Sequence, residues 1–487
     1  MAKRVAVIDI GSNSIRMVVY EKTSRFAFHI LHEIKSRVRL SENAYQNSNN
    51  LQTDPMQRTY DALEGFLSII SSYKARKTLC VATSALRDAP NKKEFLDRVR
   101  IGLGLKIKII DGEKESYFGA VACANLLPEQ ENALSIDIGG GSTEFSLINK
   151  KEINNNLSLK LGTVRLKELF FDKQDRDGAI KYIDSQLDSL DNVNISTIIG
   201  IGGSFRAISE ILLSRENYPL KKLHAYESSS DKFKNLLKDI LNANEDELKE
   251  IGIKKSRVDV IKPGALILQR VLKKFKVNNL ITSGVGVREG VYLNDLLRNS
   301  KDKMPVNYNT SLRYILDSHV DNKEYSNNLN KLVKQIFDIT YAKLDIDKKY
   351  RYELGVAAKI CMSGSNIHTY SEYKHSYHLI QDALEFGFTH KQTTLIATLV
   401  KYAKRKRPSN LHVEKYSSLL PDSPTLNTLS YILSLSISLL AHKPKNIDFS
   451  LEFAKNELVI STKKSLYLAK ESIKKIDPLD NLTVKIT

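Results

Sequence analysis

Leu134-Ser-Ile-Asp-Ile-Gly-Gly-Gly-Ser-Thr-Glu-Phe145 is the stretch on which the expected fold depends. Its apolar first half predicts a buried strand that carries one carboxylate, Asp137, and the residues after the three glycines predict a second strand. Glycines permit positive φ and leave backbone N–H groups open toward a ligand, so successive amides in such a turn bind anions. The pattern favours a phosphate site with Mg²⁺ held beside Asp137. The alternative is a glycine-rich hairpin turn with a structural aspartate.

A second stretch, Val5-Ala-Val-Ile-Asp-Ile-Gly-Ser-Asn-Ser14, has the same design. It predicts another strand, an aspartate (Asp9), a turn with glycine and small polar residues, and a second strand. Two such hairpins in facing half-domains predict a clamp for a polyphosphate. Arg16 follows the turn closely, where a guanidinium reaches a phosphate bidentately; the alternative is a solvated strand residue.

The composition limits the classes of function. The chain has 487 residues, of which 42% are hydrophobic, which is enough for two to four domains. The formal net charge of +18 favours a polyanionic partner: nucleic acid, an anionic membrane or a phosphate-rich substrate. A generally basic proteome is the alternative explanation of that charge.

The three cysteines are far apart and form neither a disulfide framework nor a zinc spacing, which predicts a reducing compartment. The chain enters a strand at once, without a signal peptide, and no apolar run reaches membrane-spanning length. The expectation is therefore a soluble, cytoplasmic protein.

Further strand-to-loop-to-helix units carry candidate site residues. The loop at 82–89 brings hydroxyl groups and Arg87 toward a substrate, although Ser84 also suits a helix cap. The unit at 200–206 opens a helix with Gly202, Gly203 and Ser204, and exposed N–H groups at a helix start bind phosphate. Lys35, Arg37 and Arg39 alternate along one strand face, which is either a phosphate-facing surface or an exposed edge; the two explanations are left equal.

Around Asp111 to Val121 a strand ends, a glycine turns the chain, and a helix opens with glutamates in its first turn. Acidic residues favour helix N-termini through the macrodipole, and this explains one of them. The functional explanation assigns the other, near the phosphate clamp, to the activation of water.

Six motifs in order give the first 300 residues a specific resemblance. They are Asp9-Ile-Gly-Ser-Asn-Ser, Ala82-Thr-Ser-Ala-Leu-Arg, Gly112-Glu-Lys-Glu-Ser, Asp137-Ile-Gly-Gly-Gly-Ser-Thr-Glu, Gly200-Ile-Gly-Gly-Ser and Gly286-Val-Arg-Glu-Gly. The chain resembles the exopolyphosphatase / guanosine pentaphosphate phosphohydrolase (Ppx/GppA) family of the actin-like ATPase superfamily. The resemblance implies an α/β fold of two actin-like, ribonuclease H-like half-domains around a cleft, at residues 1–122 and 123–299.

The same resemblance implies roles for individual residues. The catalytic glutamate falls on Glu115, while Lys114 stands where relatives often have a second acid; that departure removes a carboxylate from the site and makes Glu113 a rival base. The metal-associated acids fall on Asp137 and Glu144, and Asp9 has the equivalent place in the first hairpin. The implied phosphate-binding residues, with those inferred above, are Gly11, Ser12, Asn13, Ser14, Arg16, Arg87, Gly139, Gly140, Gly141, Ser142, Thr143, Gly202, Gly203 and Ser204.

Residues 300–487 are lysine-rich, helical in pattern and almost free of glycine motifs, which places a domain boundary near residues 297–305. They resemble the family's helical HD-like domain, and we expect an all-α domain there. Cys361 and Met362 stand where metal-dependent relatives have a His-Asp pair, so the resemblance implies a retained fold without metal chemistry. Substrate holding or dimerisation is the expected role.

The expected function is hydrolysis of the terminal phosphoanhydride of inorganic polyphosphate, together with conversion of pppGpp to ppGpp in the stringent response. The charge of +18 and the basic second half favour the long polyanion. The alternatives are a dedicated guanosine pentaphosphate phosphohydrolase, a superfamily kinase or ATPase, and a non-catalytic polyphosphate or alarmone sensor. Mg²⁺ is the expected cofactor, with a monovalent cation such as K⁺ left open. The expected partners are polyphosphate, guanosine penta- and tetraphosphate and a second copy of the chain, without a membrane or a specific nucleic acid.

Overall fold

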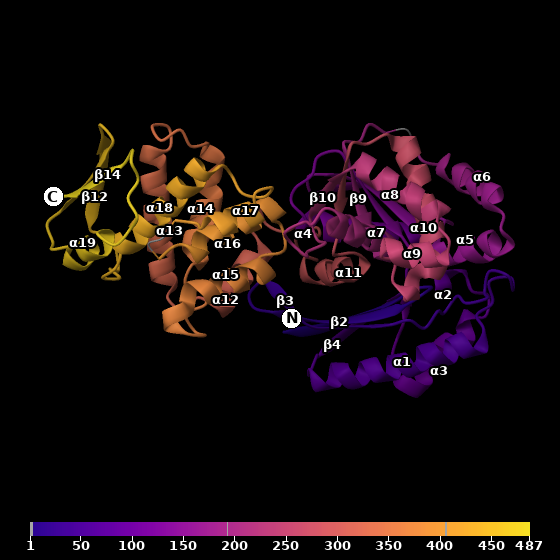
Figure 1. The fold of residues 1–487 in the computed structure, drawn as a ribbon. Coiled ribbons are helices and arrows are strands. Elements are labelled where there is room, and N and C mark those ends of the chain that lie inside the picture. Colours follow the sequence, from indigo (N-terminus) through magenta and orange to yellow (C-terminus); the bar gives the residue numbers. More distant parts are fainter. Residues whose placement is uncertain (1–2, 192, 405–406) are drawn as a thin grey trace. The chain divides into compact units, whose positions relative to one another are not determined.

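A computed structural model describes residues 3–191, 193–404 and 407–487 of the chain. The chain folds as two compact units, Met1–Tyr308 and Asn309–Thr487. Figure 1 shows both units coloured along the sequence. The first unit contains every residue of the predicted site, and its two sheets form two lobes.

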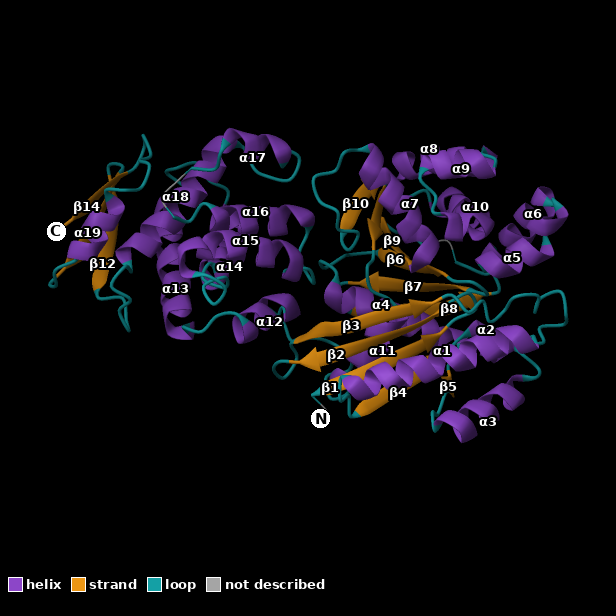
Figure 2. Ribbon diagram, turned by 60° about the horizontal axis from the view of Figure 1, so that its bottom comes forward, coloured by secondary structure: helices purple, strands orange, loops and turns teal. Residues whose placement is uncertain are grey.

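The first lobe is built on a sheet in the order β3-β2-β1-β4-β5. Its strands are β1 (Arg4–Ile10), β2 (Ile15–Lys22), β3 (Phe28–Ser36), β4 (Lys77–Ala82) and β5 (Lys108–Ile109). The first three are antiparallel, whereas β4 and β5 run parallel to β1. Helices α1 (Thr53–Ser72) and α3 (Lys92–Leu103) cover one face, as Figure 2 shows, and bury Leu63, Phe66, Phe95 and Val99 against the strands.

The second lobe repeats this plan in a sheet in the order β10-β11-β9-β6-β7-β8. The strands are β6 (Ala133–Ile138), β7 (Thr143–Asn149), β8 (Glu152–Leu159), β9 (Thr197–Ile201), β10 (Tyr226–Ser229) and β11 (Asn279–Thr282). Again three strands form antiparallel hairpins, and β9 runs parallel to the leading strand β6.

The helices of the first unit bury apolar faces against these sheets. Besides α1 and α3 they are α2 (Ser84–Asp88), α4 (Gly112–Leu126), α5 (Thr163–Leu169), α6 (Arg176–Leu187), α7 (Gly202–Arg215), α8 (Ser230–Asn242), α9 (Glu245–Ile251), α10 (Val258–Phe275) and α11 (Val287–Leu296). Helix α4 packs Ala120 and Cys123 on one face of the second sheet, and α7, α8 and α10 pack on a separate core.

The predicted internal repeat is visible in the strand registers. Asp9 lies opposite Arg16 across β1–β2, and Asp137 lies opposite Glu144 across β6–β7. Each aspartate is one residue from the end of its strand, where the glycine turn begins. The local pattern of strand, aspartate and turn therefore produces the same hairpin in both lobes.

The second unit is mostly helical, as expected. Its helices are α12 (Thr310–Ser318), α13 (Lys323–Thr340), α14 (Arg351–Ile360), α15 (Glu372–Ala383), α16 (His390–Lys401), α17 (Asn410–Lys415), α18 (Ser423–Leu439) and α19 (Tyr467–Ile473). The unit also contains strands, which the expectation of an all-α domain did not include: β12 (Phe449–Ala454), β13 (Glu457–Thr462) and β14 (Thr483–Ile486). Leu458 and Ile460 of β13 are buried in the helical core, so these strands complete it.

Residues 300–308 belong to the first unit, although the sequence places the boundary near residues 297–305. The predicted boundary between residues 122 and 123 falls inside α4. Over the described ranges, no helix is both long and apolar enough to cross a membrane.

Candidate active site

A cavity of about 150 Å³ lies in the first unit, lined by residues from both sheets. It contains most of the residues predicted for the site. Those that line it are Asp9, Gly11, Ser12, Asn13, Ser14, Arg16, Glu115, Asp137, Gly139, Gly140, Ser142, Glu144, Gly202, Gly203 and Ser204.

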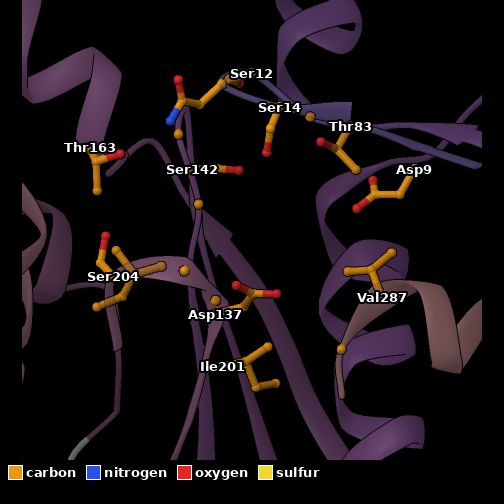
Figure 3. A pocket seen from close by; sticks show the side chains of 18 of the residues that line it. Asp9, Ser12, Ser14, Thr83, Asp137, Ser142, Thr163, Ile201, Ser204 and Val287 are labelled. Atoms are coloured by element: carbon orange, nitrogen blue, oxygen red, sulfur yellow. The ribbon is translucent and has the colours of Figure 1, made fainter. Parts of the chain in front are cut away.

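The two hairpin turns face each other across this cavity. Figure 3 shows the carboxylates of Asp9 and Asp137 directed into the same space from β1 and β6. The turns also touch, since a Cβ at Gly140 would lie 2.8 Å from the Cβ of Ser12. A side chain at Gly140 would therefore force the two lobes apart.

Three predicted phosphate-binding residues do not line the cavity. Arg87 donates to Oε2 of Glu115 at 2.9 Å and to the carbonyl of Ile110 at 3.2 Å. Thr143 is fully buried and donates to the carbonyl of Leu161 at 2.6 Å. Gly141 packs so closely that a Cβ would meet the hydroxyl of Tyr45 at 2.3 Å.

Each of these three residues either is hydrogen-bonded to another part of the protein or is closely packed against it. Arg87 is best described as the partner of Glu115, and the other two belong to the turn's own packing. Local sequence could not reveal this, because each of these contacts joins residues from different elements or loops.

Glu115 is the buried acid at the start of α4. Its side chain is held by Arg87, and burial, followed by the negative charge of Glu144, raises its pKa well above the usual range. A carboxylate with a raised pKa is a stronger base, provided that its ionised form is retained. Arg87 supplies that stabilisation while it fixes one carboxylate oxygen.

The rivals of Glu115 lie elsewhere. Glu113 and Lys114 are both exposed, and neither lines the cavity. The backbone N–H of Lys114 donates to Asp111, which caps the helix, and its ammonium lies 5.9 Å from the Phe118 ring. The lysine therefore removes no carboxylate from the cavity, contrary to the expectation from sequence. Helix geometry explains the difference, because adjacent residues point about 100° apart.

Three carboxylates gather beside Glu115. Burial and the charge of Asp137 raise the pKa of Glu144 to about 7, and burial raises that of Asp137 to about 6, with a further contribution from Asp9. Burial also raises the pKa of Asp9. These acids repel one another in a buried place, and a hard cation with oxygen ligands is the group that relieves such repulsion.

The carboxylates fit such a cation only with further ligands. In the part of the chain that the structure describes, no three His, Cys, Asp or Glu side chains are grouped closely enough to hold a metal ion. The oxygens of a bound phosphate and water are the ligands that complete a Mg²⁺ shell in many phosphate sites.

Four cations that the sequence did not single out as site residues also line the cavity. They are Lys35, Arg206, Arg257 and Arg288. A signal existed for three of them, because Arg206 and Arg288 follow glycine turns as Arg16 does, and Lys35 belongs to the alternating cations noted above. Lys35 lies opposite Arg16 across β2–β3 and lines the cavity, as the phosphate-facing explanation predicts for it. Arg37 and Arg39 follow the end of β3 and do not line the cavity, so the explanation holds for Lys35 alone. Arg257 comes from the segment before α10 and carries no local signal.

Cations lie beside the acids in the cavity, since Arg288 and Arg16 oppose the rise in the pKa of Asp9. Burial, then repulsion by Arg16 and Arg257, lowers the pKa of Lys35 to about 8, although much of its side chain stays exposed. Burial, then repulsion by Arg16 and Arg288, lowers that of Arg206 to about 10. The cations thus crowd one another as the acids do. The lining has an acidic part, formed by Asp9, Glu115, Asp137 and Glu144, and a basic part, formed by Arg16, Lys35, Arg206, Arg257 and Arg288.

Ion pairs join the two lobes near the cavity. Arg37 and Arg39 both bind Asp259 of α10, at 2.9 and 3.0 Å. Arg165 of α5 binds Asp88 of α2 at 2.7 Å. These pairs hold the lobes in the arrangement that encloses the cavity.

In the second unit, Cys361 is fully buried just after α14 and Met362 follows it in a turn. The described residues of this unit contain no group of metal-binding side chains. Its predicted loss of metal chemistry stays a prediction.

Comparison with known proteins gives matches over both units. The sequence profile of the Ppx/GppA phosphatase family matches residues 18–299, and that of Ppx/GppA phosphatase domain III matches residues 309–478. A guanosine-5'-triphosphate,3'-diphosphate pyrophosphatase of Photobacterium profundum is 25% identical over 487 residues, which cover 95% of this chain and 92% of that protein. A bifunctional 3-dehydroquinate synthase/phosphatase of Fusobacterium nucleatum is 32% identical over 299 residues; the match covers 57% of this chain and only 44% of that protein.

Solved structures agree with these matches. A Ppx/GppA family member of Aquifex aeolicus has a TM-score of 0.53 at 28% identity, and covers 62% of this chain and 99% of its own. An exopolyphosphatase of Cytophaga hutchinsonii has a TM-score of 0.57 at 25% identity, and covers 62% of this chain and 100% of its own.

Proposed function

Since this chain belongs to the Ppx/GppA phosphatase family, we propose that its cavity hydrolyses the terminal phosphoanhydride bond of inorganic polyphosphate and of pppGpp. The observation that carries this proposal is the placement of Glu115. A buried glutamate with a raised pKa lies in a cavity whose lining includes three more carboxylates and five cations, one of which is Arg16.

The basic part suits the phosphates behind the scissile bond. Arginine forms paired hydrogen bonds with phosphate oxygens, and several cations together neutralise a chain of phosphates better than a single one. The glycine turns add backbone N–H groups, and α7 begins at Gly202 on the cavity wall, where a helix N-terminus favours an anion.

The acidic part suits the terminal phosphoryl group only together with a cation. We propose that Asp137 and Glu144, with Asp9, hold Mg²⁺, directly or through water. The ion would neutralise the charge on the phosphoryl oxygens.

Glu115 then acts on water. The water oxygen attacks the terminal phosphorus, the bridging P–O bond breaks, and the proton passes to the free carboxylate oxygen of Glu115. The shortened phosphate chain leaves with the bridging oxygen. Arg87 keeps the other carboxylate oxygen fixed. General-base assistance of this type contributes roughly 10²–10⁴-fold to the rate.

Two observations bear on the substrate. The net charge of +18 favours a long polyanion. The relative from Photobacterium profundum, whose name gives it a guanosine pentaphosphate substrate, matches along nearly the whole chain, which favours pppGpp. A role in the stringent response, a homodimer and a requirement for K⁺ stay predictions.

The test is a substrate panel. Purified full-length protein is incubated with polyphosphate, pppGpp and ATP, each with Mg²⁺ and with EDTA, and released phosphate is measured. We expect release from polyphosphate and pppGpp with Mg²⁺ and much less from ATP. Binding of either substrate without any release would identify a sensor instead, and activity on pppGpp alone would identify a dedicated guanosine pentaphosphate phosphohydrolase.

A further inference from the structure

The segment that leaves the first unit is bonded to the helix that carries Glu115. Oδ2 of Asp302 accepts a hydrogen bond from the hydroxyl of Tyr117 at 2.9 Å. The same oxygen accepts from Nδ2 of Asn294 at 2.9 Å. One carboxylate oxygen therefore joins α4, which contains Tyr117, to α11, which contains Asn294.

A second contact holds the same segment at the other end of α4. Asn125 donates to the carbonyl of Asp302 at 2.8 Å and accepts from the backbone N–H of Met304 at 2.8 Å. Tyr117 and Asn125 are separated by about 12 Å along the helix, at 1.5 Å per residue. The segment is thus hydrogen-bonded to α4 at two positions, Tyr117 and Asn125.

The backbone of this segment is itself unusual. Lys301 and Asp302 have φ of 51° and 58°, in the left-handed region that non-glycine residues rarely adopt. The pair forms a tight turn, which the backbone N–H of Lys303 closes by donating to the carbonyl of Ser300 at 3.1 Å. The bonds to Tyr117, Asn125 and Asn294 fix this turn against α4 and α11.

The two joined helices both deliver side chains to the cavity. Glu115 lies two residues before Tyr117 on α4, and Arg288 lies in the first turn of α11. The helices lie side by side in Figures 1 and 2, and their backbones touch, since a Cβ at Gly290 would lie 1.9 Å from the carbonyl oxygen of Phe118. A shift of either helix would change the place of Glu115 relative to Arg288.

We propose that Asp302 is a positioning residue, which sets the place of Glu115 by locking α4 to α11 from outside the cavity. The inference rests on the proposed role of Glu115 as the base. Because residue 309 begins the second unit, the same segment is the covalent link between α11 and that unit, and it is hydrogen-bonded to α4.

The first measurement compares kcat and KM for the full-length chain on whichever substrate the panel identifies. In Asp302→Ala both side-chain donors lose their acceptor. We expect kcat to fall about tenfold or more, because a misplacement of about 1 Å costs up to 10²-fold. KM should stay within about twofold, since the phosphate-binding residues are untouched.

Two variants complete this set. Asp302→Asn keeps an oxygen that accepts from both donors and should restore kcat to near the wild-type value. Lys303→Ala is the matched control, because Lys303 lies in the same segment but binds Glu152 at the start of β8 instead of α4. It should leave kcat unchanged.

A double-mutant cycle separates positioning from a loss of stability. If Asp302 acts through Glu115, then Asp302→Ala should lower kcat of the wild type but have almost no effect in a Glu115→Gln background. Thermal melting of each variant measures stability separately. An equal fall in both backgrounds would overturn the inference.

The outcomes also distinguish this inference from the proposed function. If Glu115→Gln abolishes activity while Asp302→Ala matches the wild type, the positioning role is wrong and the proposed function stands. If Glu115→Gln retains wild-type activity, the assignment of the base fails, and the positioning role fails with it.

Discussion

Arg16 and Glu144 occupy equivalent positions in the two hairpins and carry opposite charges. Each lies across a strand pair from the aspartate that precedes the glycine turn, Asp9 in one lobe and Asp137 in the other. On the next strand, Lys35 of β3 lies opposite Arg16 in the first lobe, and Ser158 of β8 lies opposite Glu144 in the second. One repeated unit therefore contributes residues to both the basic and the acidic part of the cavity.

This relationship predicts that Arg16 acts on affinity. In Arg16→Gln the cavity loses one charge-assisted contact with phosphate, worth about 1.5–3 kcal/mol, and we expect KM to rise about tenfold to hundredfold with little change in kcat. Arg25→Gln removes an exposed arginine of the same lobe that stacks on Phe26, and should have no effect. A fall in kcat at constant KM would contradict the assignment.

The base is tested by a pair of glutamates on the same helix. Glu115→Gln should lower kcat about 10²–10⁴-fold and leave KM within a few-fold, since the amide still fits the site but accepts no proton. Glu113→Gln changes an exposed residue of the same turn and should behave as the wild type. If the two variants lose similar activity, Glu115 is not the base. Steady-state kinetics provides the measurement.

Gly202 is the glycine whose backbone the site needs. Its φ is +91°, and a Cβ there would lie 2.7 Å from Oδ1 of Asp137. Gly202→Ala should therefore strain the turn, displace Asp137 and lower kcat at least about tenfold. The comparison is Gly65→Ala in α1, where a Cβ meets nothing within 4 Å. This change should leave kcat intact and raise the free energy of unfolding by up to about 1 kcal/mol.

We expect the binding of polyphosphate to depend on pH because of Lys35. Its pKa of about 8 means that it loses its charge as the pH rises past that value. Affinity for polyphosphate, measured by a binding titration with Glu115→Gln protein, should fall between pH 7 and pH 9. Adding Lys35→Arg should remove this fall, because arginine stays charged. An unchanged pH profile in the arginine variant would show that another group is responsible.

His412 predicts a pH dependence of stability in the second unit. Lys401 can only donate, and it lies 3.1 Å from Nδ1 of His412, so Nδ1 accepts and Nε2 donates to Thr398 at 2.9 Å. The histidine is therefore neutral. Burial, with repulsion by Lys401 and Lys415, lowers its pKa from 6.5 to about 4. The titratable groups that face it are Lys401, Lys415, Tyr377, Tyr402 and Tyr416.

The lowered pKa means that the folded state binds fewer protons than the unfolded state between pH 6.5 and pH 4. Stability from this residue is complete above pH 6.5 and is lost as the pH falls toward 4, by about 2 kcal/mol at pH 5. His412→Gln keeps an acceptor for Lys401 and a donor for Thr398, and does not titrate. The wild type's advantage over this variant in urea unfolding should shrink from pH 7.5 to pH 5. A constant difference would contradict the prediction.

The sequence by itself determined the two hairpins, because an apolar strand, its aspartate and the glycine turn follow one another along the chain and can be recognised locally. The glycine turns at the starts of α7 and α11 could also be recognised from the sequence. The sequence further identified Glu115 of α4 as one of two candidates for the base. These features needed only backbone propensities and the spacing of apolar residues.

Only the tertiary structure decided which side chains meet. Packing of α10 and β3 places Arg257 and Lys35 in the cavity wall. Arg87 instead donates to Glu115, and Thr143 donates to the carbonyl of Leu161. The choice between Glu113 and Glu115 depended on which face of α4 packs on the second sheet. Contacts between residues from different helices and strands leave no trace in local spacing. For this reason the basic part of the site and the hydrogen bonds of Asp302 to α4 could be identified only from the fold.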